Sequence, residues 1–221
     1  MNNIVTVISL ILLLIVSIIH LYGTYKCNRR IRKMTKWLLL PLMMVAYTFA
    51  VSHPNYYILA AFFFSWAGDV FLLGRGPQFF VLGGIAFLFS HVCFIAAYCS
   101  NIDFKAVPYV TIAPLLILFI AIVNMVRGNL KDYVPKMLKI PMIAYLMANA
   151  TMNTFAIMQM FSNPCAATIT VSLGALLFLY SDTLLFGVRF HKSNSVYKRH
   201  FLEMLAYILG EFLICYGFMQ M

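Results

Sequence analysis

Three acidic residues lie inside long apolar runs of the sequence, where ionised side chains are rare: Asp69, Asp182 and Glu211. A charge near the centre of a bilayer costs about 2.5–3.5 kcal/mol even on the scale derived from helix insertion. The remaining acids lie in polar connections or, like Glu203, at the start of a run, where solvation is expected. No lysine or arginine lies deep in a run, and burial without a cation favours a neutral carboxyl. At least one of the three acids is therefore expected to be able to donate a proton near pH 7.

Polar side chains accompany these acids at helical spacing. Ser65 precedes Asp69 by four residues, and Ser181 adjoins Asp182. Residues four apart share one face of a helix, and lipid offers a polar face no partner, so these faces should point into a bundle. Hydrogen bonding between helices is the alternative role for the serines and asparagines of these faces. The other polar residues expected to line this interior chamber are His91, Tyr145, Asn149, Asn153, Tyr207 and Glu211.

The composition indicates a protein that is embedded in a lipid bilayer. Of the 221 residues, 63% are apolar and 10% charged, whereas globular domains have about 45–50% and about 25%. The net charge of +10 does not indicate nucleic-acid binding, because the cations form short clusters between apolar runs. Five cysteines without a CxxC or a zinc-type Cys/His spacing exclude a disulfide scaffold and a zinc module.

The apolar runs predict the elements that must position the chamber. A helix needs about 20 apolar residues to cross a hydrocarbon core about 30 Å thick. The sequence predicts one all-α membrane domain, a bundle of eight transmembrane helices joined by short connections, with the second helix short and containing Pro41. The predicted spans are 4–22, 37–52, 56–73, 79–99, 107–126, 137–160, 165–188 and 201–219.

The distribution of cations sets the expected orientation. Of the 16 lysines and arginines, all except Lys105 lie in or next to odd-numbered connections. Cytoplasmic loops carry an excess of Lys and Arg, so both termini are expected on the non-cytoplasmic side. The first helix has no cation before it and a basic cluster after it, which favours a retained helix over a signal peptide. The expected location is the inner membrane of a bacterium or the endoplasmic reticulum of a eukaryote.

Two aspartates are expected at the same depth. Asp69 lies six residues before Arg75, and Asp182 lies seven before Arg189. At 1.5 Å per residue, both carboxyls lie about 9–10 Å above these cations. The aspartates should therefore approach one another across the third and seventh helices. The two arginines either anchor the topology or contact an anionic ligand.

The residues alone leave two function classes open. No HExxH, GxSxG or Walker motif is present, and the five histidines are too dispersed for a three-histidine metal site. Two membrane carboxyls fit acid–base hydrolysis of a lipid, in which one carboxyl donates a proton and the other supports water or a cation. They also fit a proton- or ion-coupled transporter of a small molecule or lipid.

Three short motifs resemble the signature of the YhhN-like lysoplasmalogenase family, and their order and spacing run over most of residues 55–220. They are Ser65-x-x-Gly68-Asp69, Gly83-x-x-x-Phe87-x-x-x-His91 and the segment from Gly174 to Ser181-Asp182. The family also has eight spans. The chain departs from the family pattern at Phe94, where a tyrosine is expected, and at Glu211, where a glutamine is expected.

The resemblance implies an activity and a substrate. Members of the family hydrolyse the vinyl ether of lysoplasmalogens to a fatty aldehyde and a glycerophospho-base. This chemistry requires one neutral carboxylic acid and one carboxylate, and the resemblance implies Asp69 and Asp182 as this pair, in either order. It requires no metal, nucleotide or other cofactor. The expected partner is a lysophospholipid with its tail between helices and its phosphate near Arg75 or Arg189. The oligomeric state is left open.

Overall fold

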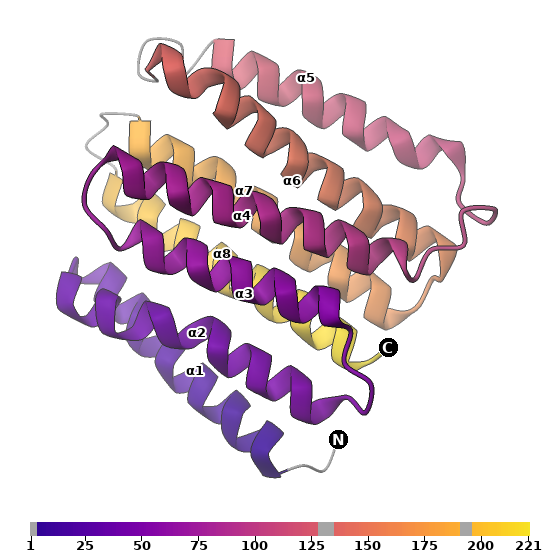
Figure 1. The fold of residues 1–221 in the computed structure, drawn as a ribbon, viewed down its shortest axis with the longest axis horizontal. Helices are drawn as coiled ribbons and strands as arrows, with labels where there is room; N and C mark the ends of the chain where they lie inside the picture. The colour runs from indigo at the N-terminus through magenta and orange to yellow at the C-terminus, as the bar shows by residue number, and fades with distance from the viewer. Residues whose placement is uncertain (1–3, 128–134, 191–195) are drawn as a thin grey trace.

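The computed structural model describes residues 4–127, 135–190 and 196–221, and every regular element in this part of the chain is helical. Eight α-helices run roughly side by side as an elongated bundle (Figure 1). The predicted all-α fold with eight helices is therefore confirmed. Their bounds are α1 (Ile4–Tyr25), α2 (Arg29–Ala50), α3 (Tyr56–Leu72), α4 (Pro77–Cys99), α5 (Ala113–Arg127), α6 (Lys136–Ser162), α7 (Ala166–Phe190) and α8 (Val196–Met219).

Among the described residues, five helical stretches are long and apolar enough to cross a membrane on their own. These are Ile4–Tyr25, Pro77–Cys99, Met137–Ser162, Ala166–Phe186 and His200–Met219. The third predicted span, α3, is apolar but has only 17 residues. The fifth predicted span is divided into a short 3-10 helix, Tyr109–Ile112, and α5, which follows it directly.

The second helix begins earlier than predicted, at Arg29 instead of residue 37. The Asn28 side chain caps this helix by accepting hydrogen bonds from the backbone N–H groups of Arg30 and Ile31, at 3.1 and 3.2 Å. Such a cap satisfies donors that the first helical turn leaves free. As a result, Lys33 and Lys36 are helical residues and not part of a loop, and this shift changes the electrostatics of the site.

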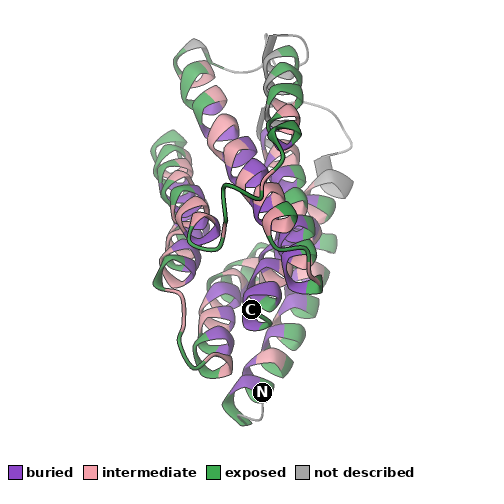
Figure 2. Cartoon of the chain, turned by 90° about the vertical axis from the view of Figure 1, so that its right-hand side faces the viewer, coloured by how far each residue is buried: buried purple, intermediate pink, exposed green. Residues whose placement is uncertain are grey.

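The connections alternate between the two ends of the bundle. The α1–α2 turn and the α3–α4 loop lie at one end, and both chain termini lie at the other (Figure 1). The side of the membrane that each end faces stays a prediction from the cations. Buried positions line the spaces between helices and exposed ones follow their outer faces (Figure 2). The exposed residues include many large apolar side chains, such as Ile8, Leu14 and Ile117, as expected for a surface in contact with lipid.

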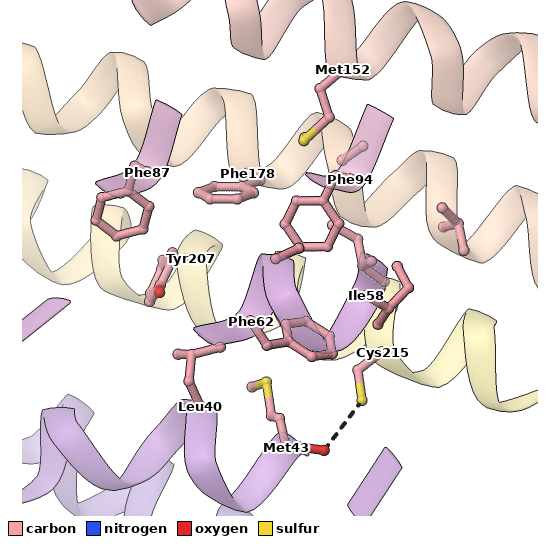
Figure 3. Close-up of a cluster of buried hydrophobic side chains, with 14 of the residues drawn as sticks. Leu40, Met43, Ile58, Phe62, Phe87, Phe94, Met152, Phe178, Tyr207 and Cys215 are labelled. Carbon is pink, nitrogen blue, oxygen red and sulfur yellow. Dashed lines mark hydrogen bonds between the residues drawn. The ribbon is translucent and has the colours of Figure 1, made fainter. Parts of the chain in front are cut away.

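Glycine permits close contact between α7 and α8. A Cβ atom added to Gly174 would lie 2.7 Å from the carbonyl oxygen of Gly210, so a larger residue would push the two helices apart. Between this pair and α3 and α4 lies an aromatic core in which the rings of Phe87, Phe178 and Tyr207 meet (Figure 3).

Candidate functional site

Asp182 on α7 is held by side chains of α6. The Tyr145 hydroxyl donates a hydrogen bond of 2.7 Å to Asp182 Oδ2, and the Asn149 amide donates one of 2.5 Å to the same oxygen. Asn153 in turn donates to Asn149 Oδ1 at 2.8 Å. Because these three residues are four apart on α6, a single helical face presents them all. Asp182 is 4% exposed, and both of these donors are neutral groups.

His91 on α4 lies beside this group but makes no hydrogen bond to it. Its Nε2 is 3.6 Å from Asp182 Oδ2, which is too long for a hydrogen bond. The imidazole is fully buried, with its ring centroid 5.1 Å from that of Tyr145 and 5.2 Å from that of Phe178. Neither ring nitrogen has a hydrogen-bond partner among the described residues. Buried polar atoms are usually satisfied, so both nitrogens are suited to binding a substrate oxygen or water.

Asp69 on α3 has a cationic partner, contrary to the expectation from the sequence. Lys36 Nζ lies 3.0 Å from Asp69 Oδ1, and the Tyr207 hydroxyl donates a hydrogen bond of 2.9 Å to Oδ2. The aspartate is 1% exposed and the lysine side chain 12%. The apolar runs of the sequence predict Lys36 in a connection, whereas in the structure it is a residue of α2. The sequence does contain a pattern that indicates a helix at Lys36, since the cations at 29, 32, 33 and 36 follow helical spacing.

The two aspartates occupy separate hydrogen-bonded groups linked by aromatic rings. The Tyr207 ring, whose hydroxyl binds Asp69, has its centroid 5.6 Å from that of Phe178. Phe178 in turn contacts His91, next to Asp182. No hydrogen bond joins the two carboxyls among the described side chains. The main neighbours of α3 are α2 and α4, and those of α7 are α6 and α8. The direct approach of the two aspartates across α3 and α7 stays a prediction.

A third buried polar group lies around Glu211 on α8. Glu211 is fully buried, and neither of its oxygens makes a hydrogen bond of good geometry. Ser65 is near enough to interact with this carboxyl, but its hydroxyl is paired with that of Ser90 at 2.8 Å. Sequence reasoning missed Ser90. Ser181 faces away from Asp182 and donates to the backbone oxygen of Glu203 at 3.0 Å.

Glu203 itself is buried, not solvated as expected. It is 5% exposed, and its Oε2 lies 2.6 Å from His200 Nδ1. A residue three positions away on the same helix can reach it in this way. This pair therefore satisfies a buried acid at the start of α8, outside both aspartate groups.

The cations at the α1–α2 end of the bundle form a basic pocket. Arg75 and three cations of α2 border a cavity of about 390 Å³, and none of the four has an acidic partner within salt-bridge distance in the described structure. The other three are Arg29, Arg30 and Lys33. Arg189 lies near the end of α7, but its side chain is outside the described part of the chain. The pocket therefore provides the positive charge required to bind an anionic group.

Among the described residues, no three His, Cys, Asp or Glu side chains converge closely enough to hold a metal ion. The groups that the structure does bring together are those of acid–base chemistry. They are a carboxyl with neutral hydrogen-bond donors, a carboxyl with a lysine, and a histidine with two free nitrogens. The catalytic and binding roles of the predicted site residues stay predictions.

Comparison with known proteins places the chain in a family. No curated protein and no solved structure matches it. The sequence profile of the YhhN family matches residues 31–218, which include α3, α4, α6 and α7 and most of α2 and α8. All of the side chains that form the two aspartate groups lie within this range. The chain therefore belongs to the YhhN family.

Proposed function

We propose that this protein is an integral-membrane hydrolase that cleaves the vinyl ether bond of lysoplasmalogens to a fatty aldehyde and a glycerophospho-base. The observation that carries the proposal is the difference between the surroundings of the two aspartates. Asp69 is paired with Lys36, whereas Asp182 has no lysine or arginine within salt-bridge distance among the described residues. Pairs of acids whose environments separate their protonation states are typical of acid–base sites.

Asp182 is the proton donor in this proposal. Its Oδ2 accepts both hydrogen bonds, from Tyr145 and Asn149, so Oδ1 is the oxygen that carries the proton. A buried carboxyl without a cation favours its neutral form. The two donors also fix the orientation of the carboxyl, because α6 presents both from one face.

The reaction begins with transfer of the Asp182 proton to the β-carbon of the vinyl ether, which makes the α-carbon and ether oxygen an oxocarbenium ion. Water bound by His91 adds to the α-carbon and returns a proton to Asp182. The resulting hemiacetal then loses its hydroxyl proton, the bond between the α-carbon and the ether oxygen breaks, and the glycerol oxygen takes up a proton. The products are an aldehyde and an alcohol, and Asp182 is again protonated.

Asp69 supplies negative charge in this proposal. Lys36 and Tyr207 hold the carboxylate in place, so its charge is fixed before the reaction begins. A preorganised charge inside a low-dielectric bundle stabilises a developing cation more than it would in water. The ring contacts through Phe178 indicate that the Asp69 and Asp182 groups belong to one buried region.

The test uses purified protein with two lysophosphatidylethanolamines, one carrying a 1-alkenyl chain and the other a 1-acyl chain. Aldehyde is expected from the alkenyl lipid and not from the acyl lipid. Release of fatty acid from the acyl lipid alone would identify an esterase. Aldehyde from neither lipid, combined with proton-dependent solute uptake into liposomes, would support the transporter alternative.

A further inference from the structure

An apolar groove opens beside the Asp182 group. A cavity of about 170 Å³ is lined mainly by α4 and α6, with contributions from Leu72 on α3 and Phe186 on α7. All of its lining residues are apolar except Tyr145, whose ring forms part of the wall. Val81 and Ile85, which also line the groove, are 39% and 46% exposed, so the groove opens on the face of α4 that contacts lipid.

The groove borders the Asp182 group directly and the Asp69 group through one intervening aromatic ring. Tyr145 lines it and donates its hydroxyl to Asp182 Oδ2. Phe87 also lines it, and the Phe87 ring centroid is 6.1 Å from that of Tyr207, which binds Asp69. A molecule in the groove would therefore have its inner end against Tyr145, which orients Asp182, and against Phe87, which packs on the Tyr207 ring.

Gly84 keeps this groove open. A Cβ atom added to Gly84 would meet no atom within 4 Å, whereas one added to neighbouring Gly83 would lie 3.0 Å from Leu72 and 3.3 Å from the Gly68 carbonyl. Packing of α3 against α4 thus explains the glycine at 83 but not the one at 84. Glycine inside a helix is destabilising relative to alanine. At position 84 the lack of a side chain leaves space in the groove instead of allowing helices to approach.

We propose that this groove binds the hydrocarbon chain of a single-chain ether lysolipid and that Gly84 determines whether the chain can enter. The inference rests on the proposed function, because it takes the lysolipid from there. An apolar cavity of about 150 Å³ binds benzene, so this groove encloses on the order of six carbons. It is too narrow for a helix of a second copy, which is about 10–12 Å across. The enclosed carbons are those next to the ether, and the rest of the chain extends into the bilayer.

Photolabelling tests the proposal without requiring catalysis. The probe is a lysophosphatidylethanolamine with a saturated 1-alkyl ether and a diazirine at the fourth chain carbon, which lacks the vinyl group and cannot be cleaved by protonation. Peptide mapping of the wild-type protein in nanodiscs is expected to place the label on residues 77–88 and 138–145. Labelling of the exposed face of α1 and of residues 89–99 of α4, instead of residues 77–88 and 138–145, would overturn the proposal, whatever the variants do.

Two tryptophan variants on α4 provide the matched comparison. Gly84→Trp fills the groove and is expected to reduce labelling of residues 138–145 at least tenfold. Val92→Trp adds the same side chain at a position that is 54% exposed and does not line the groove, so labelling should be unchanged. Gly84→Ala, which adds one methyl group, should retain labelling and shows that loss of glycine alone is tolerated. Equal labelling of Gly84→Trp and wild type would contradict the proposal.

The outcomes separate this proposal from the proposed function. Label in the groove together with no aldehyde from the alkenyl lipid would support the chain site and reject vinyl ether hydrolysis. Aldehyde release together with label outside the groove would support the hydrolysis and reject the chain site.

Discussion

Lys36 Nζ lies 3.0 Å from Asp69 Oδ1 and pairs a cation of α2 with an acid of α3 inside the bundle. The lysine stem can follow the apolar surface while its ammonium group stays near the basic end of the helix. In the proposed mechanism this pair keeps Asp69 negatively charged, and Asp182 is the acid without a lysine or arginine partner in the described structure. The roles that we propose for the two acids follow from this difference.

Replacing Lys36 with methionine should destabilise the protein. The substitution leaves a buried carboxylate whose remaining described partner is the Tyr207 hydroxyl, and an uncompensated buried charge costs up to about 3–5 kcal/mol. The free energy of unfolding in mixed detergent micelles measures the loss. Lys33→Met is the matched control, because Lys33 is an exposed residue of the same helix.

The double variant Lys36→Met/Asp69→Asn completes this experiment. It removes the acid together with its cation, so most of the lost stability should return. If the double variant is as unstable as Lys36→Met alone, the charge of Asp69 is not the cause of the loss.

The sequence predicted the fold and most of the Asp182 group for physical reasons. Apolar runs separated by basic clusters give eight helices, and the four-residue spacing of Tyr145, Asn149 and Asn153 places them on one face. All three are buried, and two of them bind Asp182. Helical spacing predicts such local arrangements because it fixes which side chains share a face.

The Asp69 group could not be predicted in the same way. Its members, Lys36, Asp69 and Tyr207, lie on three helices, and nothing in their spacing indicates which helices are neighbours. The direct approach of the two aspartates is predicted from equal depth alone, and it stays a prediction. Depth places residues along the membrane normal but does not specify lateral distance, which here is set by helix packing and by the aromatic rings of Phe178 and Tyr207.

Arg75→Gln should weaken substrate binding without slowing the chemical step. Arg75 borders the basic pocket, where the substrate phosphate would be bound equally in the ground and transition states. Loss of such a contact raises KM and leaves kcat unchanged. Steady-state kinetics with the alkenyl lysolipid measure both constants. Lys105→Gln is the control, since this cation lies in the α4–α5 connection, away from the pocket, and a similar rise in KM for both variants would argue against a phosphate site at Arg75.

Two native cysteines test the orientation. Cys27 is exposed at the α1–α2 turn, and Cys165 lies at the α6–α7 turn. In variants that keep one of them and replace the other four cysteines with alanine, an impermeant maleimide should label Cys165 in sealed right-side-out vesicles. Cys27 should require permeabilisation. The reverse pattern would invert the predicted topology.

The pH dependence of this labelling provides a further check on Cys165. Hydrogen bonds from the backbone N–H of Thr168 and, to a smaller extent, from its hydroxyl lower the pKa of the Cys165 thiol. The thiolate is the reactive form, so a lower pKa means that labelling begins at a lower pH than for an ordinary thiol. Thr168→Val removes the hydroxyl and should move the onset of labelling to higher pH. An unchanged onset would show that the Thr168 hydroxyl does not affect the thiol.

Glu211→Gln should preserve both stability and aldehyde release. Glu211 is fully buried without a hydrogen bond of good geometry, and an ionised carboxylate there would be costly, so the neutral acid is expected. Glutamine has nearly the same shape and is the residue that the family resemblance implies. Thermal unfolding and the single-turnover rate are the measurements. A rate loss as large as that of Asp182→Asn would make Glu211 part of the acid–base machinery.

Asp182→Asn should abolish turnover and leave the fold intact. The asparagine oxygen can still accept hydrogen bonds from Tyr145 and Asn149, but the amide cannot deliver a proton to carbon. General acid catalysis contributes about 10²–10⁴-fold, so the single-turnover rate of aldehyde release should fall by at least that factor. Asp103→Asn, in the α4–α5 connection, is the control and should retain the wild-type rate.

Asp69→Asn should also slow the reaction, because it removes the fixed charge that stabilises the oxocarbenium ion. If folded Asp182→Asn protein releases aldehyde at the wild-type rate while Asp69→Asn does not, Asp69 is the proton donor and the roles inferred from the Lys36 pair are reversed.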